Sequence, residues 1–410
     1  MYYLTNIKKG KYTILDSITG EVSVVDLNVL LYNLNNNVEI IGCHKGTRGF
    51  RCRIYPNKIQ REKINQTIGC CRKLWNEMLG DYINNYKVTG TYMKINEGPY
   101  KFKFPYMIDV DSIALQQSRI DLQAALRNYF NSKQGIRKGT QMGFPRFKSK
   151  NVSKESYRTN STNNNIRIEN RKDISPLDAE RSKNKRLIIP QFNPSGKGTK
   201  QALKIIVTEP INGNIKNVTI ERTKTNEYYA SICCDNCWIF KVISEKEIAN
   251  NLEVIGIDGG IKTYLTIDNG INFRKEKIEF DEAYSDSIKK NTRLLHKVQQ
   301  EFSQTEKTSN NHKKIRLKIA KYHEKLRRTR QDYRHKITNK LSKESAIISI
   351  EDLNIKGMMQ DTNHDKNRGF QEVSLYETYR QLSYKQEWRN HIIVKVSRTF
   401  ASSQLCNICG

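Results

Sequence analysis

The stretch Leu252-Glu-Val-Ile-Gly-Ile-Asp258-Gly-Gly260 has the composition of an apolar strand that ends in a carboxylate. A second stretch, Ala346-Ile-Ile-Ser-Ile-Glu351-Asp-Leu-Asn354, repeats the pattern with Glu351 at its end. A half-buried carboxylate at the end of an apolar strand costs free energy unless a positive charge meets it. Two of them on neighbouring strands also repel, and a divalent metal ion is the usual remedy. Taken alone, Asp258 before two glycines equally suits the cap of a turn, and that alternative stays open.

The intervening sequence predicts how these strands are ordered. Residues 263–267 and 271–274 have the composition of two further strands separated by Gly-rich turns, and a long helical pattern covers residues 286–344. Three antiparallel strands, a helical excursion and another strand ending in a carboxylate are the order of an RNase H-like fold. In that fold the two carboxylates meet at one end of the sheet. Two metal ions there would activate a water and stabilise the attacking and leaving oxygens of a phosphodiester. We therefore predict Asp258 and Glu351 as catalytic ligands of Mg²⁺.

The charge of the chain predicts its partners. The 410 residues include 71 Lys and Arg against 42 Asp and Glu, a formal net charge of +29. Charge on this scale bears on partners rather than on the fold, and nucleic acid is the first candidate. An anionic membrane surface is the second, although we see no transmembrane run, lipidation motif or signal peptide. A merely solubilising surface is a third alternative, against which the clustering of the charge argues.

The cysteines indicate a compartment and a second metal. Nine cysteines, an odd number that includes adjacent pairs, do not form a disulfide framework, which predicts a reducing cytoplasm and, in a bacterium, association with the nucleoid. The stretch Cys406-Asn-Ile-Cys409-Gly410 has the spacing of half a zinc ribbon, so Cys406 and Cys409 are candidate Zn²⁺ ligands. A structural zinc needs four ligands, and Cys234-Asp-Asn-Cys237 has matching spacing. That pair lies at the end of a different set of strands, so ordinary packing is the alternative for Cys234 and Cys237.

A basic helix is predicted ahead of the Glu351 strand. Residues 313–343 contain thirteen Lys and Arg and two acidic residues. A solvated helix normally interleaves charges of opposite sign, so we expect an acidic polymer to lie against this one. An exposed basic helix without a partner is the alternative.

A second basic segment has aromatic residues between its charges. Residues 143–150 read Gly-Phe-Pro-Arg-Phe-Lys-Ser-Lys. Arg146 and Lys148 can neutralise phosphates, while Phe144 and Phe147 can stack on bases. The alternative is an ordinary loop with two Phe side chains anchored in a core.

The region around this segment is mixed in structure. Residues 50–56 read as an alternating strand that stops at a proline, helical patterns cover residues 60–86 and 112–130, and short strands recur from 203 to 239. A β-barrel or sandwich with an inserted helical segment explains this order.

Together these motifs resemble those of TnpB, also called OrfB, a family of transposon-encoded RNA-guided DNA endonucleases related to type V CRISPR effectors. The resemblance covers residues 48–410 in the family's order. It rests on Phe50-Arg-Cys-Arg-Ile-Tyr-Pro56, Gly69-Cys-Cys-Arg-Lys-Leu-Trp-Asn76, residues 143–150, the Asp258 and Glu351 stretches, and residues 400–410.

The resemblance implies an α/β multidomain protein. It implies a β-barrel wedge domain with an inserted helical lobe, then an RNase H-like (RuvC) nuclease domain with a long basic helical insertion and a partial zinc ribbon. The expected boundaries are 1–46 for a small accessory unit, 47–60 with 141–248 for the wedge, 61–140 for the helical recognition lobe, 249–400 for the nuclease domain and 401–410 for the start of the zinc module.

The resemblance also implies a guide RNA from the transposon end and a double-stranded DNA target as partners. It assigns catalysis and Mg²⁺ to Asp258 and Glu351, and Zn²⁺ to Cys406 and Cys409. With the basic segments, it gives these candidate nucleic-acid-binding residues: Arg51, Arg53, Tyr55, Arg72, Asn76, Phe144, Arg146, Phe147, Lys148, Lys262, Lys325, Arg327, Arg328, Arg330 and Arg334.

The chain departs from the family pattern at one point. In this family a second Cys pair and a third catalytic Asp follow the position of Gly410. We therefore expect either an RNA-guided endonuclease represented by an incomplete chain or a nuclease-inactive, RNA-guided DNA-binding repressor. A DNA transposase that performs strand transfer also uses an RNase H-like site, and the spacing of the carboxylates does not exclude it.

Overall fold

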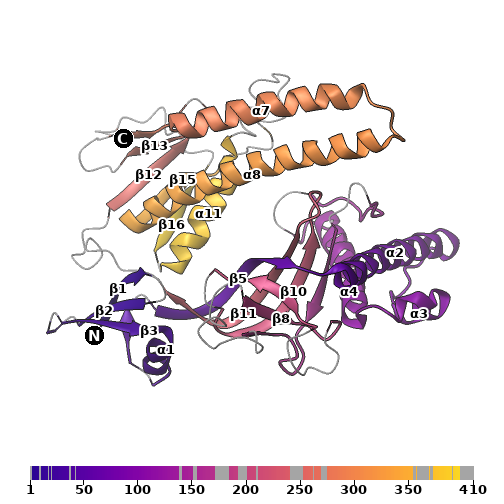
Figure 1. Cartoon of the computed structure of the whole chain (residues 1–410), viewed down its shortest axis with the longest axis horizontal. Helices are drawn as coiled ribbons and strands as arrows, with labels where there is room; N and C mark the ends of the chain where they lie inside the picture. Colours follow the sequence, from indigo (N-terminus) through magenta and orange to yellow (C-terminus); the bar gives the residue numbers. More distant parts are fainter. Residues whose placement is uncertain are drawn as a thin grey trace. The chain divides into compact units, whose positions relative to one another are not determined.

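The computed structural model divides the chain into two compact units, one formed by Lys45–Trp238 and the other by Met1–His44 with Ile239–Gly410 (Figure 1). The residues that it describes are 2–8, 11–16, 18–19, 21–36, 38–41, 43–137, 141–150, 155–170, 184–192, 201–208, 211–240, 253–261, 263–268, 275–353, 357, 369, 373–389 and 391–397. The mixed α/β class predicted from the sequence is confirmed.

A seven-stranded sheet forms the centre of the unit Lys45–Trp238. Its strand order is β6-β10-β11-β5-β9-β8-β7. The strands are β5 (Cys43–Tyr55), β6 (Glu155–Asn160), β7 (Arg167–Asn170), β8 (Lys185–Ile188), β9 (Leu203–Ile206), β10 (Asn214–Arg222) and β11 (Tyr228–Phe240). Along β11, buried and half-buried residues alternate as far as Asp235. Asn236, which is exposed and has φ of 51°, is an extra residue that interrupts this alternation, so that Cys237 lies on the buried face.

Three helices and a short 3-10 turn lie between β5 and β6 in the chain. They are α2 (Lys58–Thr89), α3 (Gly98–Lys103), the 3-10 turn Pro105–Met107 and α4 (Ser112–Lys133). A capping box begins α2: the Asn57 side chain accepts from the Gln60 amide at 2.9 Å, and the Gln60 side chain accepts from the Asn57 amide at 3.0 Å. Gly90, with φ of 68°, ends it. The apolar faces of α2 and α4 pack together and join the core beneath the sheet.

The N-terminal segment forms a small sheet of its own. Its order is β3-β2-β1-β4, with β1 (Tyr2–Lys8), β2 (Lys11–Asp16), β3 (Val22–Asp26) and β4 (Ile40–Ile41), and α1 (Leu27–Asn35) connects β3 to β4. Leu4, Ile14 and Leu30 are among its buried side chains.

A five-stranded sheet lies in the C-terminal part of the chain. Its order is β14-β13-β12-β15-β16, with β12 (Glu253–Gly259), β13 (Leu265–Asp268), β14 (Lys275–Ile278), β15 (Ser345–Glu351) and β16 (Ile392–Val396). The pairs β12–β13 and β13–β14 are antiparallel, whereas β12–β15 and β15–β16 are parallel. The strand predicted over 271–274 falls outside the described residues, and β14 begins at Lys275.

Helices connect the parallel strands of this sheet. A hairpin of α7 (Glu282–Ser303) and α8 (Asn310–Glu344) leads from β14 to β15, and the two helices run side by side (Figure 1). Between β15 and β16 lies α11 (Leu375–Trp388), which packs against α8. Leu375, Tyr379 and Leu382 of α11 cover the buried isoleucines of β12 and β15. None of the helices in the described part of the chain is both long and apolar enough to cross a membrane.

Candidate functional site

The two predicted carboxylates end neighbouring parallel strands. In the register of β12 and β15, Ile257 lies beside Ile350, so the next residues, Asp258 and Glu351, follow at the same edge of the sheet. Side chains alternate along a strand, and both isoleucines point into the core. Asp258 and Glu351 therefore share the opposite face, where Asp258 is exposed and Glu351 half-buried.

The pKa of a tyrosine on α11 is affected by both carboxylates. Burial raises the pKa of the Tyr379 hydroxyl, and the negative charges of Asp258 and Glu351 raise it further. Tyr379 was not predicted from the sequence, although Gly259, interpreted there only as part of a turn, indicated a close approach at this point. A methyl group on Gly259 would lie 2.7 Å from the Tyr379 hydroxyl oxygen, so glycine is needed here because α11 approaches the strand closely.

The paired carboxylates fit a hard divalent cation. Among the described residues, no group of three or more His, Cys, Asp and Glu side chains is placed to hold a metal ion. Mg²⁺ keeps several waters and is often held by one or two carboxylates together with phosphate oxygens of the substrate. Asp258 and Glu351 match that donor set. Lys262, Cys406 and Cys409 fall outside the described residues.

Cys234 and Cys237 are side chains of the protein interior. Both are fully buried on β11. Both belong to the hydrophobic core of the unit Lys45–Trp238, and burial raises the pKa of the Cys234 thiol to about 12. Their place in this core favours the packing alternative for this pair.

The segment 143–150 is fixed to α2 by hydrogen bonds to its backbone. The Trp75 indole donates to the Arg146 carbonyl at 3.0 Å. Asn76 accepts from the Lys148 amide at 2.7 Å and donates to its carbonyl at 2.9 Å. The Lys148 ammonium lies 3.6 Å from the centre of the Trp75 ring, and burial lowers its pKa.

Only part of this segment therefore faces solvent. The Phe144 ring packs edge-on against Tyr129, 5.1 Å between ring centres, as the core alternative described. Phe147 is 58% exposed, and Arg146 is exposed beside it. Arg146 and Phe147 are thus the two predicted side chains here that are presented to a ligand.

Three predicted residues alternate along β5 and form a second cationic and aromatic surface. The Arg51 guanidinium stacks on Tyr229 at 3.8 Å, and Arg53 donates to the Tyr229 hydroxyl at 3.1 Å while it pairs with Glu227 at 2.6 Å. Tyr55 is exposed next to them. Tyr229 is a member of this surface that sequence analysis missed, although its alternating strand gave the signal. The last predicted residue of this unit, Arg72, is half-buried on α2.

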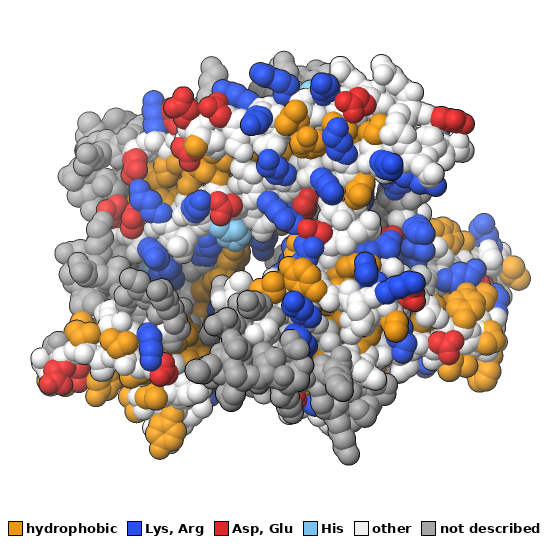
Figure 2. All heavy atoms as spheres, viewed as in Figure 1, with side chains coloured by type: hydrophobic (Ala, Val, Ile, Leu, Met, Phe, Trp, Pro, Cys, Tyr) orange, Lys and Arg blue, Asp and Glu red, His pale blue; other side chains and the backbone are white. Residues whose placement is uncertain are grey.

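The predicted cations of α8 differ in exposure. Figure 2 shows Lys and Arg side chains spread over the surface of α7 and α8. Lys325, Arg327 and Arg328 are exposed, and the last two bind Glu324 at 2.7–2.9 Å, which lowers the pKa of Glu324 to about 2. Arg330 is half-buried, and Arg334 is only 7% exposed, beneath α11.

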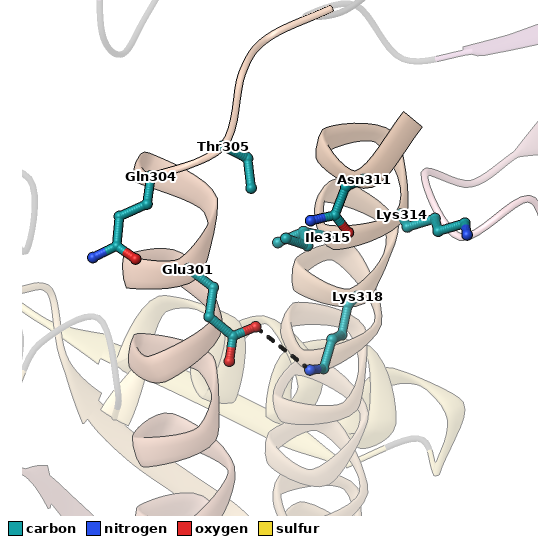
Figure 3. Close-up of a pocket in the computed structure, with 7 residues that line it drawn as sticks. All are labelled: Glu301, Gln304, Thr305, Asn311, Lys314, Ile315 and Lys318. Carbon is teal, nitrogen blue, oxygen red and sulfur yellow. Dashed lines mark ion pairs between the residues drawn. The ribbon is translucent and has the colours of Figure 1, made fainter. Parts of the chain in front are cut away.

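A cavity of about 550 Å³ opens where α7 ends and α8 begins (Figure 3). Glu301 and Lys318 form an ion pair across it at 3.7 Å, and Lys314 points away from the other lining residues. Its lining residues are mostly polar, and the Glu301–Lys318 pair is the ion pair that the structure describes among them, so we assign it no chemistry.

Comparison with known proteins gives two family matches. Residues 238–362 match the OrfB family model of IS605 elements described as "Probable transposase", and residues 46–91 match one described as "Helix-turn-helix domain". In the structure, the second range contains part of β5 and one continuous helix, α2, rather than two helices joined by a turn.

Two relatives are similar to the chain over most of its length. One from Streptomyces pristinaespiralis is 25% identical over 379 residues, which cover 88% of this chain and 80% of the relative. InsQ of Escherichia coli strain K12 is 25% identical over 390 residues, which cover 89% and 84%. Both names describe RNA-guided DNA endonucleases. The solved structure of a "Cas12f1-sgRNA-target DNA complex" aligns over 86% of this chain and 76% of that chain, with a TM-score of 0.46 and 14% identity.

These matches support the expected similarity to proteins encoded by transposons. Within that class, the two family matches and both relatives support a protein of the TnpB family, also called OrfB.

Proposed function

We propose that this protein is an RNA-guided DNA endonuclease that hydrolyses phosphodiesters at Asp258 and Glu351. The observation that carries the proposal is the parallel register of β12 and β15, which brings both carboxylates to one edge and one face of the sheet. The names of the two relatives support the same activity. A formal net charge of +29 suits a chain that holds a guide RNA and a double-stranded DNA target.

We assign the five-stranded sheet to an RNase H-like (RuvC) domain. Numbered from β12, its strands are ordered 3-2-1-4-5, with strands 1 to 3 antiparallel and strands 1, 4 and 5 parallel, which supports this assignment. We assign the seven-stranded sheet to the wedge domain and α2 to α4 to its inserted helical lobe. The zinc module, with Cys406 and Cys409, remains part of the proposal.

Different residues would position the strand ends, bind the metal ion and bind the nucleic acid. Ile257 and Ile350 are buried and hold the ends of the two strands in place, so that Asp258 and Glu351 present carboxylate oxygens on one face. A divalent cation bound by them would activate a water and stabilise the charge that develops on the phosphate. Exposed Arg146 and Phe147, and the Arg51–Tyr229 surface, are suited to hold the nucleic acid by phosphate contacts and stacking.

The test compares Asp258→Asn and Glu351→Gln with Asp352→Asn. Asp352 is an exposed carboxylate next to Glu351 and serves as the matched control. Changes to groups that merely support metal ligands cost about 10–100-fold, so loss of a ligand should reduce cleavage of guide-matched DNA by at least about a hundredfold. Mn²⁺ binding, measured by calorimetry, should fall in the same two variants and stay unchanged in the control.

Three results would contradict the proposal in different ways. Equal cleavage by wild type and Asp258→Asn would remove the catalytic assignment. Guide-dependent binding without any cleavage by the wild type would favour the repressor, and joined strand-transfer products would favour the transposase.

A further inference from the structure

The strand register brings a row of side chains to the edge of the five-stranded sheet. Thr266 of β13 lies opposite Asp258, Lys277 of β14 lies opposite Thr266, and Val396 of β16 lies beside Glu351. Consecutive residues pair without a bulge from β12 through β14. Paired residues on neighbouring strands point to the same face, so these side chains share the face of the two carboxylates. Across the sheet, this carboxylate row reads Lys277, Thr266, Asp258, Glu351 and Val396.

Lys277 supplies the positive charge of the carboxylate row. It is exposed, and within the described part of the chain its ammonium forms no ion pair. The preceding residue, Glu276, points to the opposite face, where it pairs with Lys340 at 3.8 Å. Asp268 lies diagonally across from Lys277 on the carboxylate face and already has a partner. The charge of Lys277 is therefore available to an anion that arrives from solvent.

The spacing of the row suits a phosphate next to the one held at the carboxylates. Neighbouring strands lie about 4.8 Å apart, so the Lys277 backbone is about 10 Å from that of Asp258, with β13 between them. The four-carbon stem of lysine is flexible and carries the ammonium over part of this span. Thr266, between the two, is half-buried and short, and it places a hydroxyl beside Asp258. A phosphate above β13 is thus within reach of the Lys277 ammonium and the Thr266 hydroxyl.

The two ends of the carboxylate row differ in chemistry. Beyond Glu351 the row continues to Val396, and the same face of β16 carries Ile392 and Val394, which are 57% and 44% exposed. These apolar side chains offer a phosphate neither charge nor a hydrogen bond. A polyanion that crosses the described part of this face is therefore attracted toward β13 and β14 rather than toward β16.

We propose that Lys277 binds a phosphate adjacent to the scissile one on the DNA strand that is cut, and that Thr266 donates a hydrogen bond to the same phosphate. This assignment rests on the proposed function and adds to it the path of the strand, which crosses β12, β13 and β14 along the carboxylate row. A lysine on an edge strand such as β14 also discourages pairing with another chain. That role alone predicts no effect on the binding or cleavage of DNA.

The test removes the lysine and the phosphate separately and together. Single phosphates beside the scissile one are replaced by uncharged methylphosphonate groups in guide-matched DNA. The full chain with its guide RNA is compared as wild type, Lys277→Gln, Lys277→Arg and Thr266→Val. Lys340→Gln is the matched control, because Lys340 is exposed and its ammonium is held by Glu276 on the other face of β14. Single-turnover cleavage rates in Mg²⁺ are measured for each protein on each DNA.

At one position, the neutral group should slow the wild type by about tenfold, as expected for one lost hydrogen bond to a charged group. Lys277→Gln should be slower on unmodified DNA by a similar factor and lose nothing further at that position, because both changes remove the same contact. Lys277→Arg keeps the charge and should keep most of the rate, and Thr266→Val should show a smaller loss. Equal rates for Lys277→Gln and wild type, or losses that multiply at every position, would overturn the proposal.

A second measurement separates this proposal from the nuclease assignment. Dissociation constants for the same DNAs are measured in the Asp258→Asn background, where the proposed function predicts binding without cutting. Loss of the Lys277 contact should reduce the salt slope of binding by about one. Coupling between Lys277 and one phosphate supports the contact even when the wild type does not cut DNA. Cleavage that needs Asp258 but is indifferent to Lys277 keeps the nuclease assignment and removes this one.

Discussion

Gly259→Ala tests whether the close approach of α11 to β12 holds the carboxylate edge in place. The added methyl group would lie 2.7 Å from Leu375 Cδ2, 2.7 Å from Tyr379 Oη and 3.0 Å from Leu375 Cδ1. Carbon atoms pack best at about 3.5–4.0 Å, so the Leu375 and Tyr379 side chains, or α11 with them, must shift away from the strand. Overpacking of this kind lowers the free energy of unfolding by about 1–3 kcal/mol. Alanine also reduces the conformational entropy of the unfolded chain, which offsets about 0.4–1 kcal/mol of this loss. A net loss of about 1–2 kcal/mol lowers Tm by roughly 2–8 °C.

Thermal unfolding and hydrogen exchange measure this effect. Exchange should accelerate in peptides from β12 and α11 and stay unchanged in α2. Gly69→Ala is the matched control, because no atom lies within 4 Å of a methyl group at that position inside α2. That change should stabilise the protein by about 0.5–1 kcal/mol through helix propensity.

The close approach of α11 also predicts coupling between Gly259 and Tyr379. Tyr379→Phe removes the hydroxyl oxygen that meets the new methyl group, so the double variant should lose less than the sum of the two single variants. Strict additivity, or a Gly259→Ala protein as stable as wild type, would refute the close approach that we infer.

Two further predictions concern other parts of the chain. Asn76→Ala removes both side-chain bonds to the Lys148 backbone, so trypsin should cut at residues 146–150 faster than in wild type. The half-buried Asn85, whose side chain bonds only within its own helix end, gives the control Asn85→Ala, and equal rates in the two variants would contradict this. Burial lowers the pKa of Lys385 from 10.5 to about 8, so the unfolded chain binds more protons between those values and the free energy of unfolding rises with pH across that window. Lys385→Met should lose this rise in denaturant titrations at pH 7.5 and 10, and parallel pH profiles would argue against it.

The sequence was sufficient to predict the carboxylate pair. An apolar run that ends in an acid is a local pattern, and parallel pairing brings the ends of two such runs together. Tyr379 could not be found in this way, because its position depends on how α11 packs against the sheet. Arg334 shows the same limit: the charge pattern marked α8 as basic but did not reveal that α11 covers this one residue.

Strand neighbours were harder to predict than the strands themselves. The strands of the large sheet are visible as alternating runs, yet β5 lies between β11 and β9, which come more than a hundred residues later. Such pairings depend on tertiary contacts rather than on local pattern. The long helical pattern before Glu351 also did not show its division into α7 and α8. In the structure, the Ser309 side chain accepts from the His312 amide and begins the second helix.

The two ends of the α7–α8 hairpin differ in how many side chains of α8 they bury. All the fully buried side chains of α8 lie from Leu326 onward, where the helix meets the sheet and α11. Its first half is held to the end of α7 by contacts such as the stacking of His312 on Phe302 at 4.1 Å. Segments with few buried contacts open at lower free energy than the core. The outer half of the hairpin should therefore open at a lower free energy than the half that packs against the sheet and α11.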